Sequence, residues 1–389
     1  MALPIKQVAE LLNNAAKEIT GVTTVVKEDL SNVVDFGKDV FDNTDVEGYV
    51  KAIGVTLAKT VFYNRTYSGF APSLMRDSFE FGWVTRKMTV DELPDAVNNE
   101  AWNLTNGGSI DPYVITLPKL SVKYFKEGIT LEVDITIAPK QAKMSLNSAV
   151  EASNFIAMIM SAVENKMTID NDILTSFVVK SAIADVMTHG KAAQKVDLRP
   201  LYEALYPGQN IDINNAVYNE EFLRLLTHKL KTYSDKLERM TKLYNVGGKP
   251  RFTPKDKQRC LVLSDIKRGM ETYLYNAQGQ FKDENLQLIP CDTVACWQAI
   301  ADAQLKTDDM KTLSNINVRL TDGTEFNQDG ILAILYDYDA MGVNNYDESS
   351  DTIYNPKGQY TNYFFRKTAR YFVDNNENMI VFYLSPKAA

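Results

Sequence analysis

Residues 129–137 carry the most regular pattern in the chain: Ile129-Thr130-Leu131-Glu132-Val133-Asp134-Ile135-Thr136-Ile137. Apolar and polar side chains alternate throughout this run. Because successive side chains of a strand point to opposite faces, one face of the run is apolar and the other is polar. The pattern predicts a half-buried antiparallel strand, and neighbouring sequence must supply the cover for its apolar face.

The sequence before this strand predicts more β-structure around a polar loop. Aromatic residues alternate with other residues in Phe79–Trp83, and alternation returns in Tyr113–Leu117 and Leu120–Tyr124. Between them, Asp91–Ser109 is rich in Asn, Asp and Gly, which is typical of a loop tip. We therefore interpret residues 71–140 as one long β excursion. It presents apolar residues that need a partner surface, and five of them are candidate inter-subunit contacts: Phe81, Trp83, Trp102, Tyr113 and Ile115.

The sequence after the strand predicts an unusually long helix. Apolar residues recur at three- and four-residue steps from Leu146, behind a candidate cap at Ser145, to the stop at His189-Gly190. At ~1.5 Å per residue, one unbroken helix would be about 65 Å long. The polar run Asp170-Asn171-Asp172 leaves open the alternative of two shorter helices.

The remaining sequence divides into three regions. Residues 1–70 contain two amphipathic segments joined by irregular chain, which fits either an extended arm or a small helical subdomain. Residues 206–354 mix short strands with helices, including a helix capped by Asn219 and a helix over Val294–Leu305, and are expected to form a separate α/β lobe. Residues 355–389 are aromatic and predict two strands around a polar turn at Asp374–Asn378.

Composition excludes several classes of protein. The net charge is −8, so the chain lacks the overall basic charge that a dedicated DNA-binding protein needs. No apolar run is long enough for a membrane helix, and no secretion signal is expected at the start. Three cysteines, an odd number, fit a reducing cytosol better than a disulfide-bonded secreted fold.

No motif for catalysis or metal binding is present. The two histidines, His189 and His228, have no cysteine or carboxylate at ligand spacing, and Cys260, Cys291 and Cys296 lack the CxxC pairs of a zinc site. Phosphate-binding loops, dinucleotide fingerprints and nucleophile elbows are also missing from the sequence. We therefore expect no catalytic residue, cofactor or metal. An enzyme with a dispersed active site stays open as an alternative.

One stretch, Asn355-Pro356-Lys357-Gly358-Gln359-Tyr360-Thr361-Asn362-Tyr363, resembles a segment of the capsid proteins of small short-tailed phi-29-like phages, the podoviruses. The order of elements is also similar to that of tailed-phage major capsid proteins with the Hong Kong 97 fold. This resemblance implies an α+β fold. Its parts would be an N-terminal arm (1–70), an E-loop with its flanking strands (71–140), the spine helix of a P-domain (141–205), an A-domain (206–354) and returning P-domain strands (355–389).

The resemblance also implies a function and partners. The chain would be a major capsid protein that self-assembles as pentamers and hexamers into an icosahedral shell. A scaffolding protein, a portal protein and packaged double-stranded DNA, bound without sequence specificity, would be its partners. It would be made in the host bacterial cytoplasm and end in the virion, with no membrane contact. Another structural protein of a phage or host is the remaining alternative.

Overall fold

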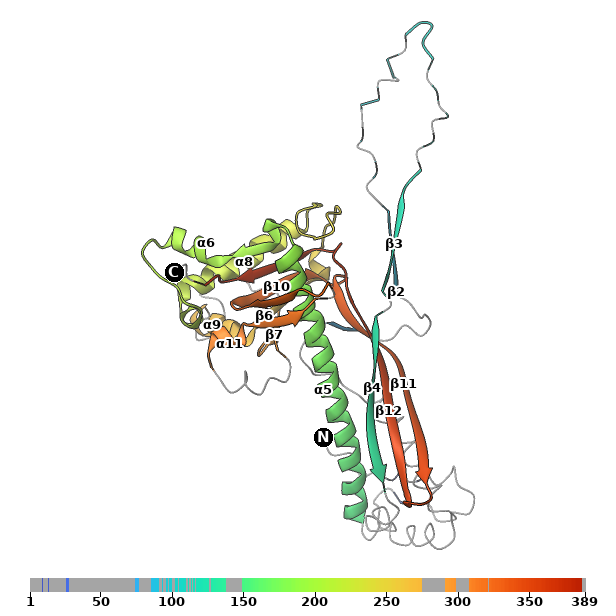
Figure 1. Ribbon diagram of the computed structural model, residues 1–389. Helices are drawn as coiled ribbons and strands as arrows, with labels where there is room; N and C mark the ends of the chain where they lie inside the picture. The colour runs from blue at the N-terminus through green and yellow to red at the C-terminus, as the bar shows by residue number, and fades with distance from the viewer. Residues whose placement is uncertain are drawn as a thin grey trace.

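The computed structural model describes residues 74–76, 85–90, 117–125, 127–137, 149–274, 291–298, 308–320 and 322–386, with scattered residues between 9 and 27 and between 93 and 115. The predicted arm over residues 1–70 therefore lies almost wholly outside the described residues, as do Phe81 and Trp83. Figure 1 shows two sheets connected by one long helix, with a β-hairpin that projects away from both.

The long helix is a single element, α5 (Ala149–His189), of 41 residues. This confirms the unbroken rod and excludes a break at 170–172. Asp170 is accommodated because it pairs with Lys166 one turn earlier, at 3.1 Å. The helix ends where Gly190 donates its N–H to the carbonyl of Val186 at 2.8 Å.

A four-stranded sheet lies along α5, in the order β1-β11-β12-β4. Its strands are β1 (Met75–Arg76), β4 (Gly128–Ile137), β11 (Met341–Asn355) and β12 (Tyr360–Val373). The alternating run at 129–137 is β4, as predicted, and it pairs antiparallel with β12 from Thr361↔Ile137 to Arg370↔Gly128. β4 also contacts α5 within the same chain, and Leu131, Val133 and Ile135 of its apolar face are half-buried.

A five-stranded sheet forms the second body, in the order β5-β13-β10-β6-β7. All seven residues of its central strand β10 (Ile331–Asp337) are buried. The other strands are β5 (Lys195–Asp197), β6 (Gln258–Leu263), β7 (Asp292–Val294) and β13 (Met379–Tyr383). Helices α6 (Leu198–Leu205), α7 (Ile213–Ala216), α8 (Glu220–Leu237), α9 (Ser264–Leu274) and α11 (Met310–Leu313) and the hairpin of β8 (Ile316–Arg319) with β9 (Glu325–Gln328) complete this body. Two short 3-10 turns, Ala192–Gln194 and Lys255–Lys257, precede β5 and β6.

Several local predictions are confirmed here. The side chain of Asn219 accepts the N–H of Phe222 at 2.9 Å, so it caps α8 as expected. The C-terminal aromatic segment forms two strands, β12 and β13, on either side of the polar turn.

Sheet membership crosses several of the predicted domain boundaries. β4 lies in the predicted segment 71–140 but pairs with β12 in the four-stranded sheet, and β5 lies in the predicted segment 141–205 but pairs with β13 in the five-stranded sheet. β13 lies in the predicted P-domain segment 355–389 but pairs with β10 and β5 in the five-stranded sheet. β11 lies mostly in the predicted A-domain segment 206–354 but pairs with β12 in the four-stranded sheet. Contiguous segments could not predict this arrangement, because each sheet contains strands from more than one segment.

Two predicted elements take another conformation. Val294 was predicted to begin a helix, but it ends β7, where it pairs with Leu263 and is buried. Tyr113, Ile115 and Leu117 were predicted to lie in a strand, but all three are outside regular structure. Pro118 follows them and has no N–H for a ladder. No helix in the described part of the chain is long and apolar enough to cross a membrane.

Candidate assembly surface

The clearest candidate for an interaction site is the hairpin of β2 (Thr85–Val90) and β3 (Leu120–Phe125). The two strands pair antiparallel from Thr85↔Phe125 to Val90↔Leu120 and form a two-stranded sheet of their own. We call residues 85–125 the arm, and its strands β2 and β3 project away from both larger sheets (Figure 1). A two-stranded hairpin buries little surface by itself, so the arm depends on contacts at its base or with another molecule.

The outward face of the arm is apolar. Met88 lies opposite Val122, and Val90 lies opposite Leu120, so the four side chains share one face of the hairpin. These four residues and Tyr124 are all exposed. Exposed apolar side chains that lie next to one another are typical of interaction surfaces. We call this set the apolar arm face.

The candidate contact residues that can be placed lie further along the arm. Trp102, Tyr113 and Ile115 have exposed fractions of 83%, 85% and 81%. The other two candidates, Phe81 and Trp83, lie outside the described residues. The three placed residues are accessible to a partner. Met88, Val90, Leu120 and Val122 are also exposed on the arm, and the sequence pattern alone did not indicate these four residues as contacts.

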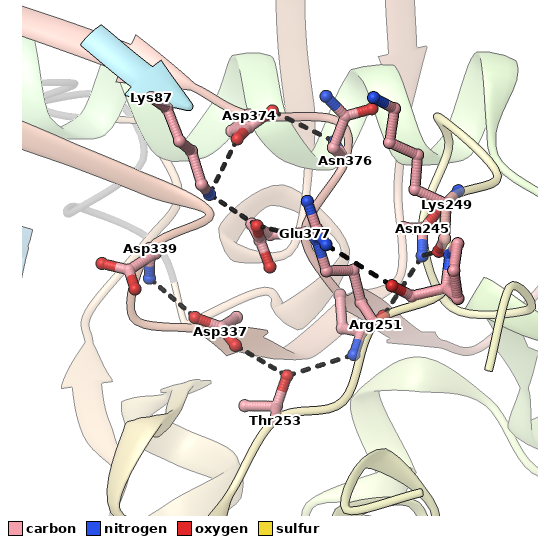
Figure 2. Close-up of polar contacts among 12 residues, drawn as sticks. Lys87, Asn245, Lys249, Arg251, Thr253, Asp337, Asp339, Asp374, Asn376 and Glu377 are labelled. Carbon is pink, nitrogen blue, oxygen red and sulfur yellow. Dashed lines mark hydrogen bonds and ion pairs between the residues drawn. The ribbon is translucent and has the colours of Figure 1, made fainter. Parts of the chain in front are cut away.

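The inward face of the arm is charged and is fastened to the body. The Lys87 ammonium lies 2.9 Å from a carboxylate oxygen of Asp374 and 2.5 Å from one of Glu377. Lys123, opposite Lys87 on β3, lies 3.0 Å from Asp374. Arg251 approaches Glu377 from the other side at 3.2 Å (Figure 2). We call these five residues the anchor cluster.

Both carboxylates of the anchor cluster are buried, with side-chain exposures of 1% for Asp374 and 9% for Glu377. Burial raises the pKa of Asp374, but Lys87 and Lys123 outweigh it, and the pKa ends below its ordinary value. Burial also raises the pKa of Glu377, and there Lys87 and Arg251 only partly oppose it, so the pKa stays raised. For Lys87, burial lowers the pKa, whereas Asp374 and Glu377 raise it further than burial lowers it. The pKa shifts of Lys87 and Asp374 both favour their ionised forms, so the two groups form an ion pair that links the arm to the body.

A hydrogen-bonded network supports the anchor cluster from beneath (Figure 2). Lys249 donates to Ser121 of β3 at 3.0 Å, which is a further link to the arm. Asn245 holds the Lys249 backbone through its side chain, because its amide oxygen accepts the Lys249 N–H at 2.9 Å and its amide nitrogen donates to the Lys249 carbonyl at 2.6 Å. Thr253 donates to buried Asp337 at 2.7 Å and accepts from Asn378 at 3.1 Å. The arm base is thus attached to a hydrogen-bonded polar layer.

A pocket of about 450 Å³ lies beside the arm base, between β3, α5, β12 and the turn after β8. Phe125, Phe177 and Tyr371 contribute aromatic walls. His189 lies at its polar end, 2.8 Å from Asp185 on the same helix and 3.5 Å from Asp322. This arrangement places the turn of the β8–β9 hairpin beside the end of α5.

The described residues include no group of three or more His, Cys, Asp or Glu side chains placed to hold a metal ion. His228, the second histidine, is exposed on α8. The alternation of β2 and β3 places Lys87 and Lys123 on the polar face of the hairpin. No local pattern indicates their partners Asp374, Glu377 and Arg251, which are distant in the sequence.

Comparison with known proteins gives the family. The model of the Phi29-like phage major capsid protein family matches residues 8–383, which is nearly the whole chain. The chain belongs to this family. Its function is therefore structural: it is a phage major capsid protein and not an enzyme. The resemblance inferred from residues 355–363 is confirmed by this match.

Solved structures of similar architecture include phage capsids. The "Capsid structure of Staphylococcus phage Andhra" is 10% identical, with a TM-score of 0.49, and the match covers 82% of this chain and 86% of that one. The "Capsid structure of the Cyanophage P-SCSP1u" is 11% identical, with a TM-score of 0.45, over 84% of this chain and 92% of that one. The family assignment rests on the family model and not on these structures. Comparison with curated proteins gave no significant match.

Proposed function

We propose that this capsid protein assembles through its arm, as pentamers and hexamers of an icosahedral shell. One observation supports the proposal most directly. The arm turns its charged face toward its own body and its apolar face outward. A hairpin fastened in this way presents a defined apolar surface to a neighbour at little conformational cost.

We assign the parts of the Hong Kong 97 arrangement to this structure as part of the same proposal. The arm corresponds to the E-loop, and α5 with the four-stranded sheet corresponds to the P-domain. The five-stranded sheet with its helices corresponds to the A-domain. In this assignment β5 and β13 belong to the A-domain, and the long strands β11 and β12 belong to the P-domain. Residues 1–70 would be the N-terminal arm.

The partners follow from the proposed role. A scaffolding protein would direct assembly, a portal protein would occupy one vertex, and double-stranded DNA would fill the shell. Contacts of about 800 Å² per partner, repeated with several neighbours, give a shell collective strength from modest individual interfaces. The net charge of −8 suits a wall that does not hold packaged DNA tightly.

The experiment is an assembly assay on the apolar arm face. The double variant Met88→Ser with Val122→Ser changes a cross-strand pair that is exposed in the single chain. The free energy of unfolding should change by about 0.5 kcal/mol or less, because these side chains bury little surface in the monomer. When the variant is expressed with its scaffolding protein, negative-stain microscopy should show no closed shells.

Thr89→Ala is the matched control, because Thr89 lies on the same strand with its side chain on the opposite face. It should assemble as the unaltered chain does. Closed shells formed normally by the double variant would contradict the proposed role of this face. Small oligomers from every chain, with scaffolding protein bound, would contradict the capsid assembly itself.

A further inference from the structure

Cys260 and Cys291 face each other across two parallel strands. β6 and β7 pair in the register Leu261↔Asp292, Val262↔Thr293 and Leu263↔Val294. One step back along both strands places Cys260 opposite Cys291. In-register residues of a parallel pair point to the same face, and the two thiols are within hydrogen-bonding reach of each other.

This spacing matches the requirement of a disulfide. Neighbouring strands lie about 4.7–4.9 Å apart, and disulfides join Cα atoms about 4.4–6.8 Å apart. Both sulfurs are thiols in this structure. Bond formation therefore needs a small adjustment of side chains and no rearrangement of the sheet.

The two sulfurs differ in access. Cys260 is fully buried on β6, and burial raises the pKa of its thiol well above the ordinary value. Cys291 is partly exposed at the edge of the sheet, and the Lys267 ammonium donates a hydrogen bond to its carbonyl at 3.0 Å. An external reagent therefore meets Cys291 before it can reach Cys260.

We propose that Cys260 and Cys291 form a reversible intrachain disulfide by exchange with a small-molecule disulfide. The Cys291 thiolate attacks the reagent and releases one thiolate, which leaves a mixed disulfide on Cys291. Cys260 then loses its proton to the released thiolate, and its sulfur attacks the Cys291 sulfur and displaces the second reagent thiolate, which takes up the proton that Cys291 lost. Two protein thiols are oxidised, one reagent disulfide is reduced to two thiols, and two protons end on those thiols.

The disulfide would cross-link the edge of the five-stranded sheet at β7 to the neighbouring strand β6. β7 has three residues and is the last strand in the order of its sheet, so its backbone pairing with β6 is short. A cross-link from Cys260 to Cys291 would hold this edge and restrict the unfolded chain. Its use in the virion rests on the proposed function: the chain is made in a reducing cytosol, and the released particle meets an oxidising medium.

The test uses the folded full-length chain and glutathione disulfide. After incubation, free thiols are alkylated, and intact mass with non-reducing peptide mapping locates each bond. We expect one disulfide joining the peptides of Cys260 and Cys291, one alkylated thiol at Cys296, and complete reversal by dithiothreitol. The thermal midpoint should rise by a few degrees on oxidation and return on reduction.

Cys296→Ser is the matched control, because it removes the third thiol and should leave the cross-link unchanged. Cys291→Ser should abolish it, and circular dichroism checks that each variant is folded. Persistent glutathione on Cys291, a bond that includes Cys296, or no oxidation of the folded chain would each overturn the proposal. None of these readouts depends on shell formation, so the result is separate from the proposed role of the arm.

Discussion

Lys87 donates a hydrogen bond of 2.5 Å to Glu377, a residue 290 positions further along the chain. The contact joins the first strand of the arm to the turn between the last two strands. Asp374 in the same turn adds ion pairs to Lys87 and Lys123. The direction of the arm is therefore fixed by charges near the C-terminal end of the sequence, and a change in that turn should alter how the arm is held.

Replacing Lys87 with methionine should detach one side of the arm. The variant keeps the length of the side chain but leaves Glu377 with Arg251 and leaves Asp374 with Lys123. We expect a loss of about 2 kcal/mol in the free energy of unfolding, because charge-assisted hydrogen bonds to buried carboxylates are lost. Urea denaturation gives this value, and limited proteolysis should cut the arm of the variant faster.

Lys257→Met is the control for that change. Lys257 pairs with Asp339 at 3.2 Å, but both side chains are largely exposed, so the loss should stay below about 1 kcal/mol. Equal losses for the two variants would show that the anchor cluster is no stronger than a surface ion pair.

The anchor cluster should make stability depend on pH through Asp374. Its folded pKa is below the ordinary 3.8, so its contribution is complete above that value and is lost as pH falls through the folded pKa. Glu377 acts in the opposite sense. Its folded pKa is above the ordinary 4.5, so its contribution is present below 4.5 and is lost as pH rises through the folded pKa.

Two isosteric variants separate these effects. Asp374→Asn should cost about 2 kcal/mol at about pH 7, and Glu377→Gln should cost less, because only Asp374 favours ionisation on folding. At about pH 3 the deficit of Asp374→Asn should shrink. Urea midpoints at the two pH values test this, and a deficit that is the same at both would rule out Asp374 as the titrating group.

The sequence predicted elements whose signal is local. The alternation of Ile129 to Ile137 gave β4, the helical period gave α5, and the cap residue Asn219 gave the start of α8. In each of these elements one face packs against the rest of the protein. The apolar side chains of that face recur at the period of the helix or strand, so the pattern can be seen in the sequence.

Pairing between strands that are far apart in the sequence leaves no local pattern of this kind. Nothing in the spacing of β13 shows that it joins β10 and not the long sheet. Cys260 and Cys291 appear unrelated because the CxxC pattern is absent, yet the register of β6 and β7 places them opposite each other. The anchor cluster was missed for the same reason, since Lys87 and Glu377 meet only in the folded chain.

Asn171 should be replaceable at a gain in stability. Its side chain on α5 is fully buried, and within the described part of the chain neither its amide nitrogen nor its amide oxygen has a hydrogen-bond partner. An unsatisfied buried amide costs about 1–3 kcal/mol, so Asn171→Leu should raise the free energy of unfolding by about 1 kcal/mol. Thr175→Val is the contrasting variant, because it removes a buried polar group that has a partner: the Thr175 hydroxyl donates to the Asn171 carbonyl at 2.8 Å. A loss for Asn171→Leu would mean that this amide has a polar partner.

The continuity of α5 can be tested with proline. Ile156 lies two turns inside the helix, where proline removes a backbone hydrogen bond and its ring clashes with the preceding turn. Ile156→Pro should cost roughly 3 kcal/mol or more and yield little soluble protein, whereas Ile156→Ala keeps the backbone and should remain soluble. Soluble Ile156→Pro that assembles normally would show that the rod is not continuous in solution.

The tip of the arm should be needed for assembly and dispensable for folding. Residues 91–119 contribute no strand to either larger sheet among the described residues, and Trp102 is exposed in the single chain. Replacing residues 91–119 with an Asn-Gly turn joins Val90 directly to its cross-strand partner Leu120. This should leave circular dichroism and the urea midpoint nearly unchanged, because the turn suits a two-stranded hairpin and no core is lost. The same deletion should abolish or deform shells in negative-stain microscopy.

Limited proteolysis gives an independent measure of the same contact. A protease should cut the free subunit between Asn98 and Gly108, since the described residues there are exposed. Assembled shells should resist cleavage at this site, because a neighbouring subunit would cover it, and Lys87→Met subunits should be cut faster than unaltered ones because the base of their arm is loosened. Equal cleavage of subunits and shells, together with normal assembly of the deletion, would mean that the arm tip is a surface loop with no part in the lattice.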